Sequence, residues 1–128
     1  MHLLVAGTIA IDDIKTPSST RTGLMGGSAA YTAMASSFFA PTRIVGIVGK
    51  DFPEEHINTL KQRAICTDGI EHSEGESFYW SGEYHNNMDE RTTHEVAVNV
   101  LEAYTPKLPA SYQSSDIVVL ANMSPKNQ

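Results

Sequence analysis

The chain has 128 residues, of which 41% are hydrophobic and 19% charged, and its formal net charge is −6. That length suits one domain with a single core, and the composition argues against a disordered or collagen-like chain. The nine Lys and Arg residues are scattered singly, so we expect no nucleic-acid partner and no membrane surface partner. No apolar stretch approaches the ~20 residues of a membrane helix, and the single cysteine, Cys66, cannot form an internal disulfide, which favours a cytoplasmic protein.

Three short apolar runs predict the strands of a buried sheet. They are residues 3–6, 44–48 and 117–120, with the sequences Leu-Leu-Val-Ala, Ile-Val-Gly-Ile-Val and Ile-Val-Val-Leu. A strand with one solvated face alternates apolar and polar residues, whereas a strand covered on both faces is apolar throughout. We therefore expect these runs to be central strands of a largely parallel sheet.

A first helix is expected to begin near Ser28, because apolar residues recur there at helical spacing. Tyr31, Met34, Ala35 and Phe38 stand at positions i, i+3, i+4 and i+7, which predicts one buried apolar face. This helix lies between the first two predicted strands.

A second helix is expected after the strand at residues 44–48. Asp51 is a suitable N-cap, Pro53 is tolerated in a first turn, and Glu54 stands where a capping-box acid would. The alternation of strands and helices predicts an α/β layer fold. The buried side of this helix is expected to hold Ile57, Leu60 and Ala64.

Residues 76–104 have the alternating pattern of an antiparallel hairpin. Phe78, Trp80 and Tyr84 alternate with polar residues, residues 86–90 supply a turn, and β-branched residues follow. A hairpin is marginally stable alone, so it must cover something. A lid over a site and a dimer contact are both open.

Candidate binding residues follow the first predicted strand. Gly7 ends that strand, and Asp12 and Asp13 come shortly afterwards. In open α/β sheets, ligands bind beyond the carboxyl ends of the strands, and a carboxylate there can accept hydrogen bonds from two hydroxyls of a polyol. The alternative is that both acids are solvated turn residues.

Two glycine motifs have both a structural and a functional interpretation. Gly26 and Gly27 precede the first helix, where paired glycines either let a ligand approach the backbone N–H groups or simply make a tight turn. The residues 46–51, Gly-Ile-Val-Gly-Lys-Asp, favour a sharp exit from the second strand and are interpreted as mainly structural.

Taken together, these motifs resemble one protein family. Gly7 with Asp12, then residues 26–31 (Gly-Gly-Ser-Ala-Ala-Tyr) and residues 45–51 resemble the N-terminal part of ribokinase-like (PfkB-type) carbohydrate kinases. The resemblance implies an α/β fold with a mostly parallel sheet flanked by helices and an antiparallel β-hairpin lid. It implies a kinase, a transferase that moves a phosphoryl group from ATP, with Mg, to a sugar hydroxyl.

The same resemblance assigns candidate substrate-binding residues. Asp12 and the turn at Gly26 and Gly27 would contact sugar hydroxyls. Trp80, with Tyr84, would offer an aromatic face to the substrate or would pack between lid and core. Two further candidates stand where the family often has other residues: Tyr31 at the place of an asparagine, with Ser28 at that of a lysine, and Asn122 at the place of an acid.

No residue of the chain is assigned a catalytic role. The family's catalytic Gly-x-Gly-Asp segment has no counterpart in residues 1–128. We therefore expect an N-terminal fragment that lacks the nucleotide-binding portion. Alone, it is expected to bind no cofactor and to be inactive. His85, Asp89, His94 and Glu95 match no standard metal-ligand spacing, so no metal site is predicted.

An uncovered sheet edge predicts a homodimer. The alternatives to a sugar kinase are a nucleoside kinase of the same family and a non-catalytic carbohydrate-binding or assembly module.

Overall fold

The computed structural model describes residues 1–128, whose strands form two four-stranded sheets. The first, the core sheet, is parallel throughout, as the apolar runs predicted. In spatial order it contains β5 (Ile65–His72), β4 (Thr42–Val48), β1 (Leu3–Ala6) and β8 (Ile117–Leu120). The prediction that all three apolar runs are central is wrong for β8, which lies at the edge and leaves Val118 54% exposed.

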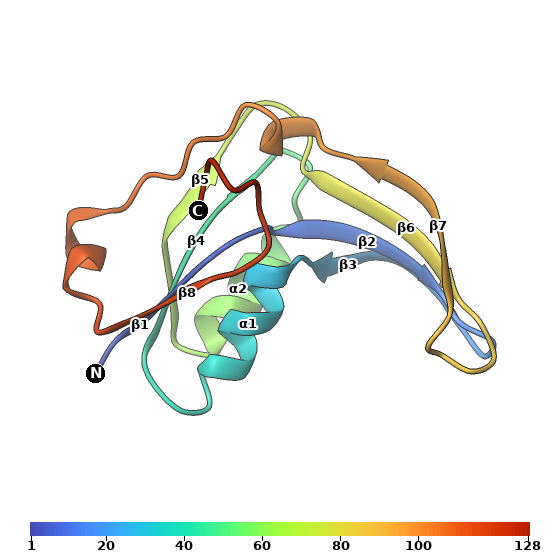
Figure 1. The fold of residues 1–128 in the computed structure, drawn as a ribbon, viewed down its shortest axis with the longest axis horizontal. Coiled ribbons are helices and arrows are strands. Elements are labelled where there is room, and N and C mark those ends of the chain that lie inside the picture. The colour runs from blue at the N-terminus through green and yellow to red at the C-terminus, as the bar shows by residue number, and fades with distance from the viewer.

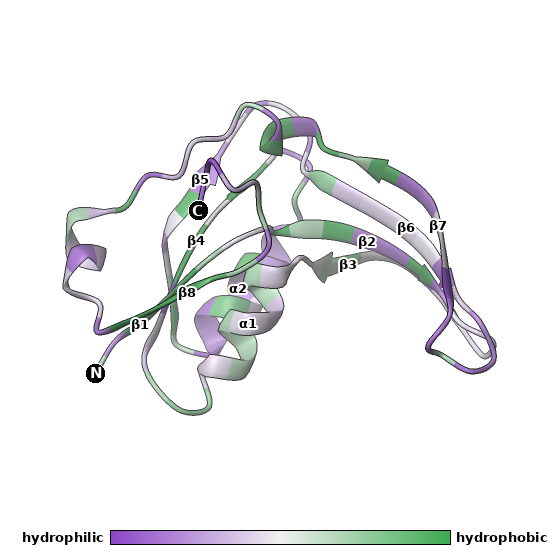
Figure 2. Cartoon of the chain, viewed as in Figure 1, coloured by the Kyte–Doolittle hydropathy of each residue, from purple (hydrophilic) through white to green (hydrophobic).

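Two helices cover one face of the core sheet: α1 (Ser28–Ser36) and α2 (Glu54–Gln62). Ala29 and Ala33 of α1 and Ile57 and Leu60 of α2 form one apolar cluster with residues of the sheet, among them Val5 and Ile44. Figure 1 shows both helices on the same side of the sheet. Because side chains alternate along a strand, Leu4 and Val45 point to the opposite face, where Tyr112 covers them. Figure 2 shows the resulting hydrophobic colour along β1, β4 and β8.

The covering of that opposite face is irregular chain rather than a helix layer. It includes two 3-10 turns, η1 (Asn99–Leu101) and η2 (Ala110–Ser114), of which the second carries Tyr112. The buried Tyr112 hydroxyl donates to the Cys66 carbonyl at 2.8 Å and accepts the Gly69 N–H at 3.0 Å. These two hydrogen bonds attach η2 to β5. Neither α-helix of the structure is long and apolar enough to span a bilayer.

The predicted buried face of α1 is wrong for Tyr31, Ala35 and Phe38, and only Met34 packs against the core cluster as expected. Tyr31 is 61% exposed and Phe38 is 70% exposed, whereas the buried residues are the small ones, Ala29, Ala30 and Ala33. Small side chains let the helix axis approach the sheet closely. The pattern was misleading because it relied on large apolar residues, of which Tyr31 lies on the outer side of α1 and Phe38 lies beyond the end of the helix.

The start of α2 also differs from the prediction. Pro53 occupies the N-cap position and no side chain caps the helix, so Asp51 is not the N-cap. Instead, the Asp51 carboxylate accepts the Ser77 N–H at 2.8 Å, and the Ser77 hydroxyl accepts the Gly49 N–H at 2.8 Å. Ile57 and Leu60 are buried as expected, but Ala64 lies beyond the helix and is exposed, with a φ of 57°.

The second sheet, here called the outer sheet, has the order β3-β2-β6-β7. The predicted hairpin forms the β6–β7 pair, although residues 99–101 turn into η1 instead of continuing the strand. Figure 1 shows this sheet extending from the core sheet as a curved flap. Its strands are β3 (Thr20–Gly26), β2 (Ala10–Lys15), β6 (Phe78–Tyr84) and β7 (Arg91–Ala97), with β2 and β6 parallel and the outer pairs antiparallel.

Candidate functional site

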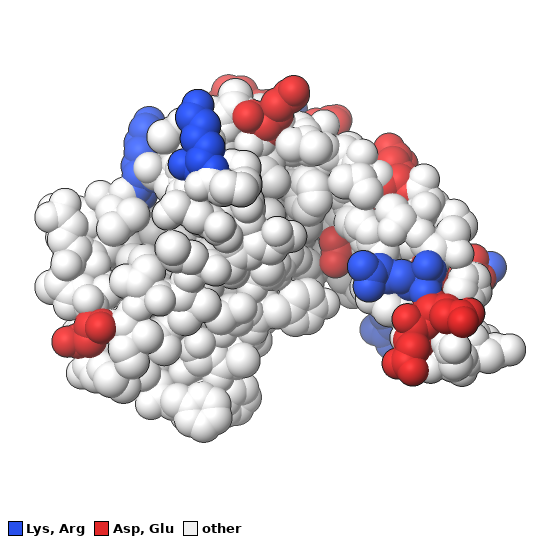
Figure 3. Space-filling model, in the orientation of Figure 1, with Lys and Arg blue, Asp and Glu red and all other residues white.

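A cavity of about 390 Å³ lies between the concave face of the outer sheet and the start of α1. We call it the inter-sheet cavity, and Figure 3 shows the molecule hollowed between its two parts. Its core-side walls are Thr8, Gly27, Ser28, Tyr31 and Asn122. Its outer-sheet walls are Ala10, Asp12, Ile14, Phe78, Trp80, Tyr84 and Arg91.

Asp12 is the buried acid of this cavity. It belongs to β2 rather than to a turn and is 9% exposed, and its carboxylate accepts no hydrogen bond from the chain. Because no fully enclosed side-chain oxygen lacks a partner, the Asp12 oxygens are open to the cavity. Burial, and secondarily the charge of Asp13, raises the pKa of Asp12 to about 6. At neutral pH the group is therefore mostly a carboxylate with free lone pairs, able to accept hydrogen bonds from ligand hydroxyls.

Asp13 points to the opposite face of β2 and has a structural role. Its carboxylate accepts the Gly23 N–H at 2.8 Å and the Tyr79 hydroxyl at 2.7 Å. The β2–β3 register shifts between Asp12 and Ile14, as a bulge at Asp13 would cause. The two adjacent acids therefore have different roles. Asp13 links β2 to β3 and β6 within the outer sheet, and Asp12 lines the cavity.

The two glycines are each required by a close contact. A methyl group on Gly26 would overlap the carboxylate of Asp12, and one on Gly27 would overlap the Thr8 carbonyl. Gly27 also has a φ of 95°, a conformation that side chains rarely adopt. The tight-turn interpretation therefore holds for Gly27, which lines the cavity as well.

The start of α1 is fastened to the loop that follows β1. Thr8 accepts the Ser28 N–H at 3.0 Å through its hydroxyl and the Ala29 N–H at 2.9 Å through its carbonyl. The Ser28 hydroxyl donates to the backbone carbonyl of Asn122 at 3.3 Å, so this bond does not involve the Asn122 carboxamide. Sequence analysis missed Thr8, because only the folded structure brings it to the helix start.

Tyr31 reaches the cavity from the outer side of α1. Partial burial, and then the negative charge of Asp12, raises the pKa of its hydroxyl, so the tyrosine remains a neutral donor at physiological pH. Its exposed position, which contradicts the predicted core role, makes it available to a ligand instead.

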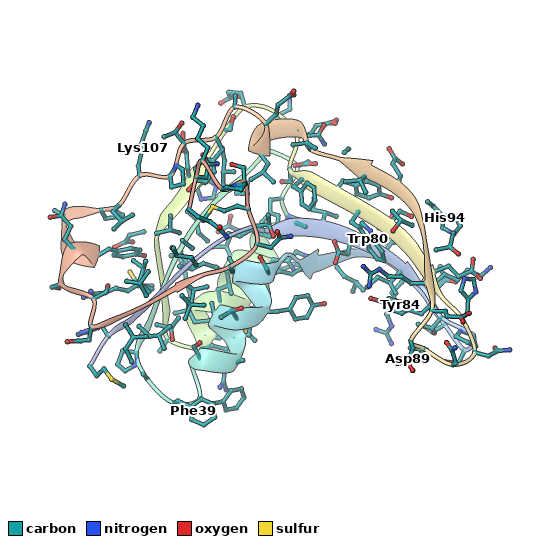
Figure 4. The ribbon with its side chains drawn as sticks, viewed as in Figure 1. Phe39, Trp80, Tyr84, Asp89, His94 and Lys107 are labelled. Carbon is teal, nitrogen blue, oxygen red and sulfur yellow. The ribbon has the colours of Figure 1, made fainter.

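Two aromatic residues of β6 line the outer wall. Trp80 and Tyr84 have ring centroids 6.3 Å apart with planes inclined at 57°, and the Trp80 indole N–H donates to the Thr93 hydroxyl at 3.3 Å. A methyl group on Gly82 would overlap the indole, so Trp80 lies across the glycine between the two aromatics. Trp80 therefore packs within the outer sheet, and Figure 4 shows both rings on this sheet.

The structure brings the sequence-predicted candidates to one place. Asp12, Gly27, Tyr31, Trp80 and Asn122 all line the inter-sheet cavity, and Gly26 lies directly beneath Asp12. Phe78 and Arg91 were not predicted as site residues. The strand alternation that links Phe78, Trp80 and Tyr84 would have indicated the first, and the hairpin register would have indicated the second.

The polar residues at the hairpin do not form a metal centre. No group of three or more His, Cys, Asp or Glu side chains is arranged to hold an ion. His94 lies 3.4 Å from a Glu83 carboxylate oxygen, while His85 bonds to the Thr92 hydroxyl at 2.7 Å. Figure 4 shows His94 on the outer side of β7 and Asp89 at the hairpin tip.

No protein-family model and no curated protein matches the sequence. Solved structures do match the fold. The structure of a protein called Sa239 aligns with a TM-score of 0.75 and 18% identity, covering 92% of this chain and 45% of its own. A nucleoside kinase from Methanocaldococcus jannaschii, described as an archaeal member of the ribokinase family, aligns with a TM-score of 0.70 and 15% identity, covering 98% and 46% respectively.

A ribokinase from Cryptococcus neoformans var. grubii serotype A, solved in complex with ADP, aligns with a TM-score of 0.65 and 17% identity. The alignment covers 93% of this chain and 40% of the ribokinase. Sequence identities this low establish the fold alone. The chain therefore has a ribokinase-like α/β fold, and it spans less than half the length of each of these structures.

Proposed function

We propose that this chain carries the acceptor-binding part of a ribokinase-like, PfkB-type carbohydrate kinase, which transfers a phosphoryl group from ATP to a sugar hydroxyl. The observation that carries the proposal is Asp12: a carboxylate 9% exposed, without a hydrogen-bond donor from the chain, and facing a cavity between two sheets. A carboxylate that opens onto a cavity with all its lone pairs free can accept hydrogen bonds from ligand hydroxyls in place of water.

The residues present in the chain suggest a role in binding the acceptor rather than ATP. Asp12, Gly27 and Asn122 would hold and orient the acceptor hydroxyls, and Trp80 would cover the sugar ring. ATP with Mg²⁺ would supply the phosphoryl group and neutralise its charge, held by further residues of a longer protein that also supply the base. Residues 1–128 are thus proposed to form the N-terminal portion of one domain, in a reducing cytoplasm that suits the free Cys66.

A nucleoside acceptor is the second candidate. The Trp80–Tyr84 pair favours it, because a nucleobase can stack on an aromatic ring. One aligned structure is itself a nucleoside kinase. A non-catalytic carbohydrate-binding module remains the alternative if no phosphoryl transfer accompanies binding.

Binding and turnover separate these candidates. Sugars and nucleosides are titrated into the 128-residue chain and its Asp12→Asn variant, and the longer protein is assayed with the same compounds, ATP and Mg²⁺. We expect binding that Asp12→Asn weakens at least tenfold, and turnover only in the longer protein. Binding without turnover by the longer protein would favour the non-catalytic module, and the absence of both would refute the proposal.

A homodimer is also proposed. The free edge of β8 leaves Ile117 42% exposed and Leu120 52% exposed, and an unpaired apolar edge strand favours association with a second copy. Light scattering at micromolar concentration tests this; a stable monomer would refute it.

A further inference from the structure

The pairing of β6 with β7 places Arg91 on the face of the outer sheet that lines the inter-sheet cavity. Arg91 of β7 lies opposite Tyr84 of β6, and directly opposed residues of an antiparallel pair share one face of the sheet. Both line the cavity. The next pair, Thr92 and Glu83, therefore faces the other side, where Glu83 forms ion pairs with Lys15 and His94.

Arg91 has no partner within the chain. It forms no ion pair and its side chain donates no hydrogen bond, although Asp89 and Glu90 precede it directly. By contrast, Arg43 donates to the Ser115 hydroxyl at 3.0 Å, and Arg63 lies 3.8 Å above the Phe38 ring.

The cavity thus has two kinds of polar lining. Groups that suit hydroxyls are Asp12 on β2 of the outer sheet and, on the core side, Tyr31 and Asn122, while β6 and β7 carry the aromatic pair and the Arg91 guanidinium. Asp12 and Arg91 form no ion pair with each other. A ligand that has both hydroxyls and a negative charge would satisfy both kinds of group. Figure 3 shows basic and acidic side chains together beside the hollow at the outer end of the flap.

We propose that Arg91 is a specificity-determining residue that binds an anionic group of the acceptor, a carboxylate or a phosphate. This inference rests on the proposed function and narrows its substrate class to sugar acids or sugar phosphates. A guanidinium binds either group through two parallel hydrogen bonds. Because the chain as a whole carries a net charge of −6, its overall field disfavours anions and selection must come from this local contact.

The single tryptophan makes the test direct, because Trp80 fluorescence reports only on this cavity. Glucose, glucuronate and glucose 6-phosphate, with ribose and ribose 5-phosphate as a second set, are titrated into the 128-residue chain, with calorimetry as an independent measurement. We expect the preferred anion to bind at least tenfold more tightly than its neutral sugar. The carboxylate and phosphate arms identify which anion is preferred.

Three variants test whether Arg91 causes the preference for the anion. Arg91→Gln should remove the tenfold preference and leave neutral sugars unchanged, Arg91→Lys should retain part of it, and Arg21→Gln should change nothing, since Arg21 does not line the cavity. Binding of the anion should also weaken with added salt.

The outcomes separate this inference from the proposed function. Neutral sugars or nucleosides that bind as tightly as the anions, with Asp12→Asn still abolishing binding, would refute the role of Arg91 and leave the acceptor site standing. An anion preference that survives Arg91→Gln would refute it equally. Failure of every compound to bind the unaltered chain would overturn both.

Discussion

The carboxylate of Asp12 occupies the space that a side chain on Gly26 would need. The two residues lie on neighbouring strands, since Asp12 pairs with Leu24 and Gly26 pairs with Ala10. The glycine therefore allows the acid to lie flat on the sheet and to turn its oxygens toward the cavity. A glycine whose sequence context indicates a helix entry thus also positions the buried acid.

Replacing Asp12 by Asn should stabilise the protein at neutral pH. The folded-state pKa of about 6 lies above the ordinary value of 3.8, so folding disfavours the charged form. The contribution of Asp12 to the stability of the unaltered protein is therefore most favourable while Asp12 is protonated, and it falls as the pH rises from about 4 to 6. We expect Asp12→Asn to be more stable by about 1–2 kcal/mol at pH 7.5, with the difference nearly lost at pH 4.

Urea denaturation of both proteins at the two pH values measures this. Comparing the two proteins at each pH cancels the other titrating groups. A stability difference independent of pH would contradict the raised pKa of Asp12.

Replacing Gly26 by Ala should disturb the acceptor site. The added methyl group displaces the Asp12 carboxylate, so we expect sugar binding to fall at least tenfold and unfolding free energy to fall by about 1–3 kcal/mol. Gly23→Ala is the matched control, because residue 23 has a φ of 66° but open space around it. That control should lower stability by about 1 kcal/mol and leave binding intact. Equal binding losses in the two variants would count against the Gly26–Asp12 contact.

Replacing Gly82 by Ala should move the Trp80 ring. The methyl group would overlap the indole, which must leave its place beside Tyr84 and lose its bond to Thr93. We expect a shift in the fluorescence spectrum of this single tryptophan and a weaker fluorescence response to ligand. Ser81→Ala, on the opposite side of β6, is the control and should leave the spectrum unchanged. An unaltered spectrum in Gly82→Ala would show that the ring does not depend on the glycine.

Replacing Ser77 by Ala should weaken the junction between the two sheets. Ser77 is 1% exposed, and its hydroxyl is the acceptor for the Gly49 N–H at the end of β4. Without it, that buried N–H is unsatisfied, which costs about 1–3 kcal/mol of unfolding free energy. Thermal or urea denaturation measures the loss, and Ser18→Ala, at an exposed position, should leave stability within about 0.5 kcal/mol of the original. A smaller loss in Ser77→Ala than in Ser18→Ala would contradict the assigned bond.

Local patterns in the sequence carried much of the architecture. The all-apolar runs predicted the parallel core strands, and the alternation around Trp80 predicted the β6–β7 hairpin. They failed where a competing contact decided the outcome: Asp51 bonds to Ser77 instead of capping α2, and the alanines of α1 are buried instead of Tyr31 and Phe38. Both errors concern which face or partner a side chain takes, and that depends on neighbours distant in the sequence.

The sequence of this acidic chain, with its singly scattered cations, by itself determined which segments form strands and which form helices, because these depend on periodicity over a few residues. It also selected the candidate residues through their spacing. Only the tertiary structure separated Asp12 from Asp13, because a bulge and the paired strands set their opposite directions. It likewise brought Arg91 to the same cavity as Asp12, because β2 pairs with β6 of the hairpin, and no local pattern specifies a pairing between strands so distant in the sequence.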